Sequence, residues 1–184
     1  MKKISVNTIL GFFLTSISFT AFCQNWENIS PEGCSCTILM PAKPEQTKRI
    51  INHSTYGKLT MNLSILQPKD STDPNLVYML SYTDYPIGTI HSDSANILES
   101  FFMSSREGAI ANVQGKLLSE TILNLSGYPG RELRLNFKNG LALLRCRNYL
   151  VKNRLYTMQI ITLTENNFNT SINKFLDSFK LLTQ

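Results

Sequence analysis

The chain has 184 residues, of which 42% are hydrophobic and 17% are charged, and its formal net charge is +5. This length supports one domain with a substantial core, and this composition excludes an intrinsically disordered chain. Four cysteines are too few for a disulfide-dense scaffold, and two histidines leave little material for a histidine-rich metal enzyme.

Residues 1–23 have the layout of a secretory signal peptide. A basic start precedes a mostly apolar run, and no acidic residue occurs before Glu27. The small residues Ala21 and Cys23 occupy positions −3 and −1 of a cleavage site before Gln24. Polar residues interrupt the apolar run, so it does not supply the ~20 apolar residues of a transmembrane span. The sequence therefore predicts an exported protein, periplasmic or extracellular, with no transmembrane span.

A lipid anchor on Cys23 is the alternative to cleavage after it. A bacterial lipoprotein signal requires a small residue just before the cysteine, whereas Phe22 occupies that position here. Cleavage would leave 16 basic and 13 acidic residues in the mature chain. A net charge that small does not by itself indicate nucleic acid or a membrane as a partner.

A lead segment over residues 24–35 precedes a single predicted domain over residues 36–184. Alternation of apolar and polar residues predicts a half-buried strand, because successive side chains point to opposite faces. The predicted strands, in chain order, cover residues 37–40, 58–65, 76–83, 116–125, 131–137, 141–151 and 154–163. Asn139-Gly140 lies between two of them and is a strong hairpin signal.

Helical spacing replaces the alternation in two places. One helix is predicted to begin after Ser94 and to run toward Glu107, with Gly108 as a plausible stop. A second helix closes the chain, because one apolar stripe forms at helical spacing. That stripe consists of Phe168, Ile172, Phe175, Leu176 and Phe179. We therefore predict an α+β domain, with a single antiparallel sheet of about six to seven strands and two main helices packed against it.

The order and spacing of several segments resemble the PsbP/DcrB-like superfamily over almost the whole mature chain. These segments are Met40-Pro41 with Pro44 after it, Tyr82–Pro86, Gly127–Glu132, Arg147 ahead of Arg154–Tyr156, and Phe175–Phe179. The resemblance implies a central antiparallel sheet with helices packed against it.

The resemblance also implies a function, because the known members of that superfamily are not enzymes. They include extrinsic subunits of photosystem II, an envelope lipoprotein needed for phage and colicin entry, and a small-GTPase-binding import factor. It thus implies a binding or accessory role, with no catalytic residue and no cofactor. Fold-level analogy is weak support for a particular function.

Basic residues concentrate between positions 131 and 154. This segment contains seven basic residues and a single acidic residue, Glu132. Period two places several of them on one face of two neighbouring strands. The candidate docking face consists of Arg134, Lys138, Arg145 and Arg147. It would bind an anionic macromolecule of the cell envelope, such as an acidic protein, a polysaccharide or lipid headgroups. The alternative is that this face is solvated and partly neutralised by acidic residues from elsewhere in the chain. Nucleic acid is a disfavoured partner, because the protein is predicted to be exported and its net charge is small.

Cysteines supply a second candidate feature. Cys34 and Cys36 are two residues apart at the start of a strand, and Cys146 lies on the apolar face of another. We predict a structural disulfide between Cys36 and Cys146, with Cys34 as the alternative partner of Cys146. Such a bond closes a loop of about 110 residues and would stabilise the folded protein by about 4–5 kcal/mol. The alternative is a metal- or redox-active site in which Cys34 and Cys36 act with His53 or His91.

Catalytic motifs are missing from the sequence. It contains no Gly-x-Ser-x-Gly elbow, P-loop or Gly-x-Gly-x-x-Gly segment. His91-Ser92-Asp93 is better explained as a loop leading into a helix cap. We therefore predict a non-enzymatic accessory or binding protein.

Overall fold

Ten strands, two α-helices and one 3-10 helix follow one another in a computed structural model that describes residues 25–182. The elements are β1 (Glu27–Ile29), β2 (Cys36–Met40), β3 (Glu45–His53), β4 (Gly57–Leu66), β5 (Asn75–Asp84), α1 (Ala95–Val113), β6 (Lys116–Leu125), β7 (Tyr128–Phe137), β8 (Ala142–Val151), β9 (Arg154–Leu163), η1 (Thr164–Asn166), α2 (Thr170–Asp177) and β10 (Lys180–Leu181). The predicted signal peptide and Cys23 lie outside the described residues.

The strands form two antiparallel sheets, so the α+β prediction is confirmed and the prediction of a single sheet is corrected. The large sheet has seven strands in the order β3-β4-β5-β9-β8-β7-β6, and the small sheet has the order β1-β2-β10. Strand β2, which we had expected in the main sheet, pairs instead with β1 and β10. Two short pairings that sequence patterning did not detect therefore hold the N-terminal and C-terminal segments together.

Strand β3 takes the seventh place in the large sheet and was also missed in the sequence. It pairs with β4 along its full length and forms one edge of the sheet. Its side chains are mostly exposed on both faces, so it carries none of the apolar alternation that marks a half-buried strand. An edge strand of this kind is held by backbone hydrogen bonds and by few buried side chains.

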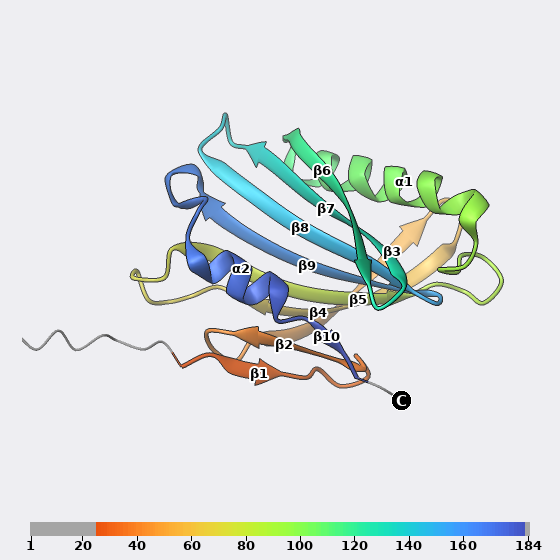
Figure 1. The fold of residues 1–184 in the computed structure, drawn as a ribbon, viewed down its shortest axis with the longest axis horizontal. Coiled ribbons are helices and arrows are strands. Elements are labelled where there is room, and N and C mark those ends of the chain that lie inside the picture. The colour runs from red at the N-terminus through yellow and green to blue at the C-terminus, as the bar shows by residue number, and fades with distance from the viewer. Residues whose placement is uncertain (1–24, 183–184) are drawn as a thin grey trace, which may run out of the picture.

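Both faces of the large sheet are covered, as Figure 1 shows: α1 lies on one face, and α2 with the small sheet lies on the other. One core forms where Phe175 of α2 and Ile38 of β2 pack with Leu80 of β5. A second core forms where Phe102 of α1 packs with Leu150 of β8. We call these faces the α2 face and the α1 face. Because side chains alternate, neighbouring residues of β7, β8 and β9 serve different cores.

Helix α2 is shorter than the predicted apolar stripe. It begins at Thr170, and the side chain of Asn169 caps it by accepting a hydrogen bond from the backbone N–H of Ile172 (3.3 Å). Phe168 therefore lies outside the helix and is 86% exposed. The remaining stripe residues, among them Phe175, are buried as expected.

Helix α1 is longer than predicted, because it continues through Gly108 to Val113. It ends at Gln114, which adopts the left-handed conformation with φ of 51°. Past Gly108, Ile110 and Val113 pack against the sheet near Leu133 of β7. This packing outweighs the low helix propensity of one glycine.

The predicted hairpin at Asn139-Gly140 is confirmed. Both residues have positive φ, at 56° and 87°, as tight hairpin turns require. The connection is longer than a two-residue turn, because Phe137 pairs with Ala142 and Lys138 also adopts positive φ. The hairpin fixes the register that places Arg134 of β7 opposite Arg145 of β8.

Candidate functional site: a basic strip on the α2 face

Glu132 is the centre of the predicted basic face. One of its carboxylate oxygens accepts a hydrogen bond from Arg145 Nη2 (2.8 Å), and the other accepts one from Arg147 Nε. The three side chains are 13%, 19% and 15% exposed, respectively, so the ion pairs are largely shielded from water. A carboxylate shared by two guanidiniums is a strong, charge-assisted arrangement.

The same two arginines also reach helix α2. Arg145 Nη1 donates to Asn173 Oδ1 at 3.0 Å, and Arg147 Nη1 donates to Asp177 Oδ1 at 2.6 Å. Arg145 and Arg147 therefore join β7 and β8 to α2. For these two residues, the alternative of a face neutralised by acids from elsewhere describes the structure better than a free docking surface does.

The pKa of Glu132 follows from this environment. Burial alone would raise the pKa of its carboxyl group, because it disfavours the charged form. The hydrogen bonds from Arg147 and Arg145, together with their charges, outweigh burial and lower the pKa below its ordinary value. Glu132 is thus held as a carboxylate.

Arg134 and Lys138, the other two residues of the predicted face, have no such partners. Within residues 25–182, neither side chain forms an ion pair or a hydrogen bond. Arg134 lies directly opposite Arg145 in the strand register, and the Nε atoms of both arginines are buried without an acceptor in the described part of the chain. Like charges in opposite positions destabilise a sheet unless an anion lies between them.

Lys116 extends this unneutralised region, although the sequence pattern did not indicate that it lies near Arg134. It begins β6 and pairs with Asn136, which lies two residues from Arg134 on the same face of β7. Lys116 is exposed and forms no ion pair with any described residue. The position of Lys116 beside Asn136 depends on the register between β6 and β7. That register shifts between Leu117 and Ser119, so sequence alternation alone does not predict the position. We call Lys116, Arg134 and Lys138 the basic strip.

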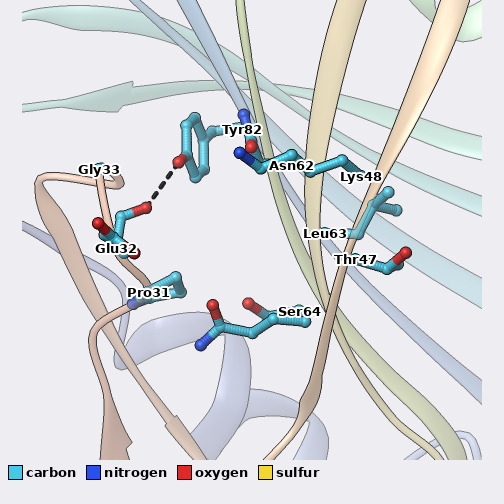
Figure 2. A pocket seen from close by; sticks show the side chains of 10 residues that line it. Pro31, Glu32, Gly33, Thr47, Lys48, Asn62, Leu63, Ser64 and Tyr82 are labelled. Carbon is cyan, nitrogen blue, oxygen red and sulfur yellow. Dashed lines mark hydrogen bonds between the residues drawn. The ribbon is translucent and has the colours of Figure 1, made fainter.

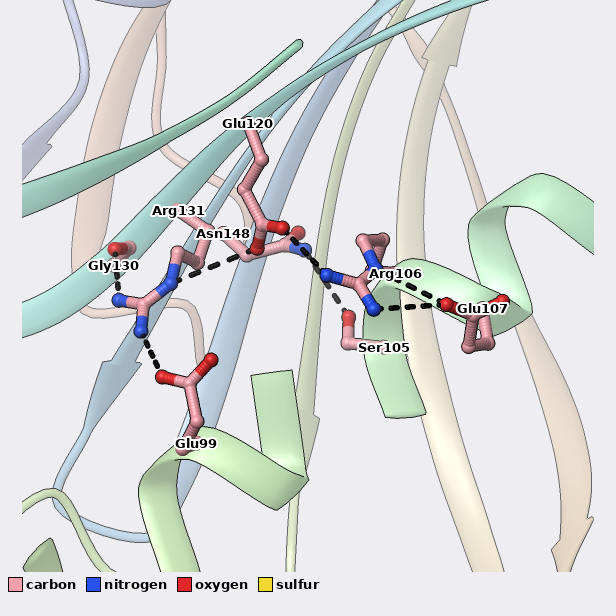
Figure 3. A network of polar contacts seen from close by, with 8 residues as sticks. All are labelled: Glu99, Ser105, Arg106, Glu107, Glu120, Gly130, Arg131 and Asn148. Atoms are coloured by element: carbon pink, nitrogen blue, oxygen red, sulfur yellow. Dashed lines mark hydrogen bonds and ion pairs between the residues drawn. The ribbon is translucent and has the colours of Figure 1, made fainter. Parts of the chain in front are cut away.

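Arg131, the first of the seven basic residues, lies on the α1 face and has acidic partners. Its guanidinium contacts Glu99 of α1 (2.7 Å) and Glu120 of β6 (3.6 Å), as Figure 3 shows. Glu120 also accepts a hydrogen bond from Arg106 of α1 at 2.8 Å. This network links α1 to the β6–β7 edge of the sheet. Because the charge of Arg131 is neutralised by Glu99 and Glu120, Arg131 is not part of a free basic surface.

The predicted Cys36–Cys146 disulfide is wrong, because Cys36 is bonded to Cys34 and Cys146 is a buried free thiol. Cys36 belongs to the core on the α2 face, whereas Cys146 packs with Leu133 on the α1 face. The large sheet therefore separates the two sulfurs. The observed bond spans a sequence separation of 2, so it constrains the unfolded chain much less than the predicted bridge would.

The loop that carries the disulfide is fastened to the large sheet by three side chains. Tyr156 donates its hydroxyl hydrogen to the backbone oxygen of Cys34 (2.6 Å), and Arg154 donates to that of Gly33 (2.6 Å). Tyr82 donates to the backbone oxygen of Glu32 at 2.7 Å, beside a pocket of about 350 Å³ that also contains Lys48 and Asn62 of β3 and β4 (Figure 2). Arg154 is in turn paired with Asp84.

The alternative metal site finds no support from these positions. Both sulfurs are occupied by their mutual bond, and His53 Nδ1 accepts hydrogen bonds from the backbone of its own turn, including that of Thr55. His91 Nδ1 likewise accepts from the backbone N–H of Asp93. Over residues 25–182, no group of three or more His, Cys, Asp or Glu side chains is placed to hold a metal ion.

Thiol alkylation tests this cysteine assignment. Burial raises the pKa of Cys146 to about 12, so almost no thiolate is present at neutral pH, and we expect iodoacetamide not to modify it in the native protein. In denaturant without reductant, Cys146 should become reactive while Cys34 and Cys36 stay protected. Peptide mapping that finds Cys34 alkylated and Cys146 protected would instead establish the long-range bridge.

Comparison with known proteins places the chain by its fold alone. Neither a protein-family model nor a curated protein sequence matches it. The structure is similar to the solution structure of cyanobacterial PsbP (CyanoP) from Synechocystis, with a TM-score of 0.52 and 12% sequence identity over 88% of this chain and 95% of that chain. The chain therefore has a PsbP-like fold, which agrees with the fold that the sequence resemblance implies.

A second solved structure is a protein of unknown function from Pseudomonas aeruginosa. It has 12% identity to this chain and a TM-score of 0.38, covering 77% of this chain and 85% of its own. That value is too low to carry an argument. Separately, no helix within residues 25–182 is long and apolar enough to cross a membrane.

Proposed function

We propose that this chain is an exported accessory protein that binds an anionic macromolecule of the cell envelope through its basic strip. The observation that carries the proposal is that three cationic side chains, Lys116, Arg134 and Lys138, lie near one edge of the sheet with no acidic partner among the described residues. Unpaired cations draw an oppositely charged partner by long-range attraction. The signal peptide predicted over residues 1–23 would deliver the protein to the envelope.

A binding role, without catalysis, is supported by the state of the titratable groups that are buried. Glu132 is held ionised between two guanidiniums, and its lowered pKa makes it a weak general base. The raised pKa of Cys146 keeps its thiol protonated and therefore weakly nucleophilic. Both groups contribute to packing and to the joining of elements, and the non-enzymatic members of the resembled superfamily agree with this interpretation.

Charge reversal tests the proposal. We expect the Arg134→Glu/Lys138→Glu protein to lose most of its co-sedimentation with native envelope fragments, and the wild-type interaction to weaken as salt rises from about 50 to 300 mM. A matched control is Lys58→Glu/Lys69→Glu, which makes the same change in net charge at exposed residues near the opposite edge of the sheet. Equal binding by the two double variants would refute the basic strip as the docking site.

A further inference from the structure

A groove of about 490 Å³ lies on the α1 face, where α1 leaves part of the large sheet uncovered. Its wall is the side of α1 that carries Ser104, Ser105 and Gly108, and its floor is formed by β3, β4, β5, β8 and β9. Tyr56 and Tyr85 also line it and pack edge to face, with ring centroids 5.1 Å apart. Pockets that enclose small molecules have volumes of about 300–1,000 Å³, so the groove is large enough for one.

The lining of the groove carries no formal charge. Twenty residues contribute to it, and none is aspartate, glutamate, lysine or arginine. Its apolar part includes Met61, Met79 and Leu155, and its polar part consists of hydroxyl, amide, thiol and imidazole groups. A charged ligand would lose its hydration there without gaining an ionic partner. The groove therefore favours an uncharged molecule with one apolar side and one hydrogen-bonding side.

One polar group on the floor has no partner. Ser81 of β5 is 2% exposed and lines the groove, yet its hydroxyl forms no hydrogen bond with any residue in the described range. Its neighbours are engaged: Asn148 Nδ2 donates to Ser105 Oγ (3.1 Å, Figure 3), and the Cys146 thiol donates to Asn148 Oδ1 (3.3 Å). Among residues 25–182, the fully enclosed side-chain polar atoms without a partner are Arg134 Nε, Arg145 Nε and Asn167 Oδ1. The Ser81 hydroxyl is not one of them, so it reaches the space of the groove and is available to hydrogen-bond to a ligand there.

The wall of the groove contains a glycine inside a long helix. Gly108 lies in the interior of α1, where glycine is less favourable than alanine. A Cβ atom built at Gly108 would meet no atom within 4 Å, and its backbone has no positive φ. Neither steric crowding nor backbone conformation thus requires glycine here, and its effect is to keep the groove wide.

We propose that this groove is a binding site for an uncharged, amphipathic small molecule, held between α1 and the sheet with a hydrogen bond to Ser81. The site lies on the opposite face of the sheet from Arg134, so it is separate from the proposed docking strip. A ligand bound here would contact α1 and five strands of the large sheet at once. It would therefore stabilise the position of α1 on the sheet.

Fluorescence titration with N-phenyl-1-naphthylamine, an uncharged amphipathic dye, tests the proposal on the purified protein. We expect saturable binding that the Gly108→Phe substitution weakens at least about tenfold, because the added ring occupies the groove. Gly108→Ala also raises helix propensity but adds only a small side chain, so it should bind nearly as wild type. Met103→Phe adds an aromatic ring to an exposed residue of α1 outside the groove and should also leave binding unchanged.

Two outcomes would overturn the proposal: a wild-type protein that does not bind the dye, or a folded Gly108→Phe protein that binds it as tightly as wild type. Ser104→Trp, at an exposed position on the same wall, provides a second blocking variant if Gly108→Phe does not fold. Displacement of the dye by the anionic dye ANS at equal affinity would contradict the preference for an uncharged ligand. Loss of envelope binding in the basic-strip variants would leave these results unaffected.

Discussion

Replacing Glu132 with glutamine is expected to lower the free energy of unfolding by about 3 kcal/mol, because removing one member of a buried ion pair strands the other. The substitution leaves Arg145 and Arg147 shielded from water, without the carboxylate that both contact. Arg134 lies beside them with no acid of its own among the described residues. Urea denaturation of the two proteins at neutral pH measures the difference.

Asp177→Asn is the matched control, because Asp177 contacts the same Arg147 but is 61% exposed. Exposed ion pairs contribute at most about 1 kcal/mol, so this variant should remain close to wild type. Equal losses in the two variants would show that Glu132 has no special role.

The stabilisation by Glu132 should also depend on pH. The pKa of its carboxyl group is lower in the folded protein than its ordinary value of 4.5, so its contribution is complete above pH 4.5. That contribution is lost as the pH falls through the folded-state pKa. The difference in stability between wild type and Glu132→Gln should therefore shrink on acidification. A difference that grows below pH 4.5 would contradict the lowered pKa.

Truncating Phe175 to alanine is expected to cost about 3–5 kcal/mol, the usual range for a large aromatic side chain in a core. Phe175 is fully buried, and its ring contacts Tyr78 edge to face with centroids 5.4 Å apart. It is one of three buried apolar residues of α2, with Ile172 and Leu176, so the loss should be measurable as a large decrease in the midpoint of urea denaturation.

Phe168→Ala provides the comparison, because the same sequence stripe contains both phenylalanines. Phe168 lies before α2 and is exposed, so its truncation should change stability by less than about 0.5 kcal/mol. Similar losses at the two positions would mean that the helix begins earlier and buries both rings.

Most of the large sheet could be predicted from local sequence patterns, because its strands alternate and its turns carry clear signals. Asn139-Gly140 adopts the positive φ values that its residue types favour. Strand β3 could not be found in this way, because its side chains are exposed on both faces and leave no pattern. The pairing of β2 with β1 and β10 depends on long-range contacts that no short window contains.

The sequence predicted which arginines share a face of the sheet, but it did not predict which of them pair with acidic residues. The alternation of β7 and β8 correctly placed Arg145 and Arg147 on the face opposite Cys146, but it could not show that α2 would bring Asp177 to that face. The same limitation explains the wrong disulfide. Which face β2 covers is a property of the tertiary structure, and that choice put Cys36 and Cys146 on opposite sides of the sheet.

We propose that the basic face divides into two arginines that stabilise the fold, Arg145 and Arg147, and cations that bind a partner, among them Arg134. The most direct test measures stability and envelope binding together for Arg134→Ala and Arg147→Ala. We expect Arg134→Ala to weaken co-sedimentation with envelope fragments about fivefold while stability stays within about 0.5 kcal/mol of wild type. Arg147→Ala should lose about 3 kcal/mol of stability, while its folded fraction binds as wild type does. The reverse pattern, with binding lost at Arg147 and kept at Arg134, would contradict the account.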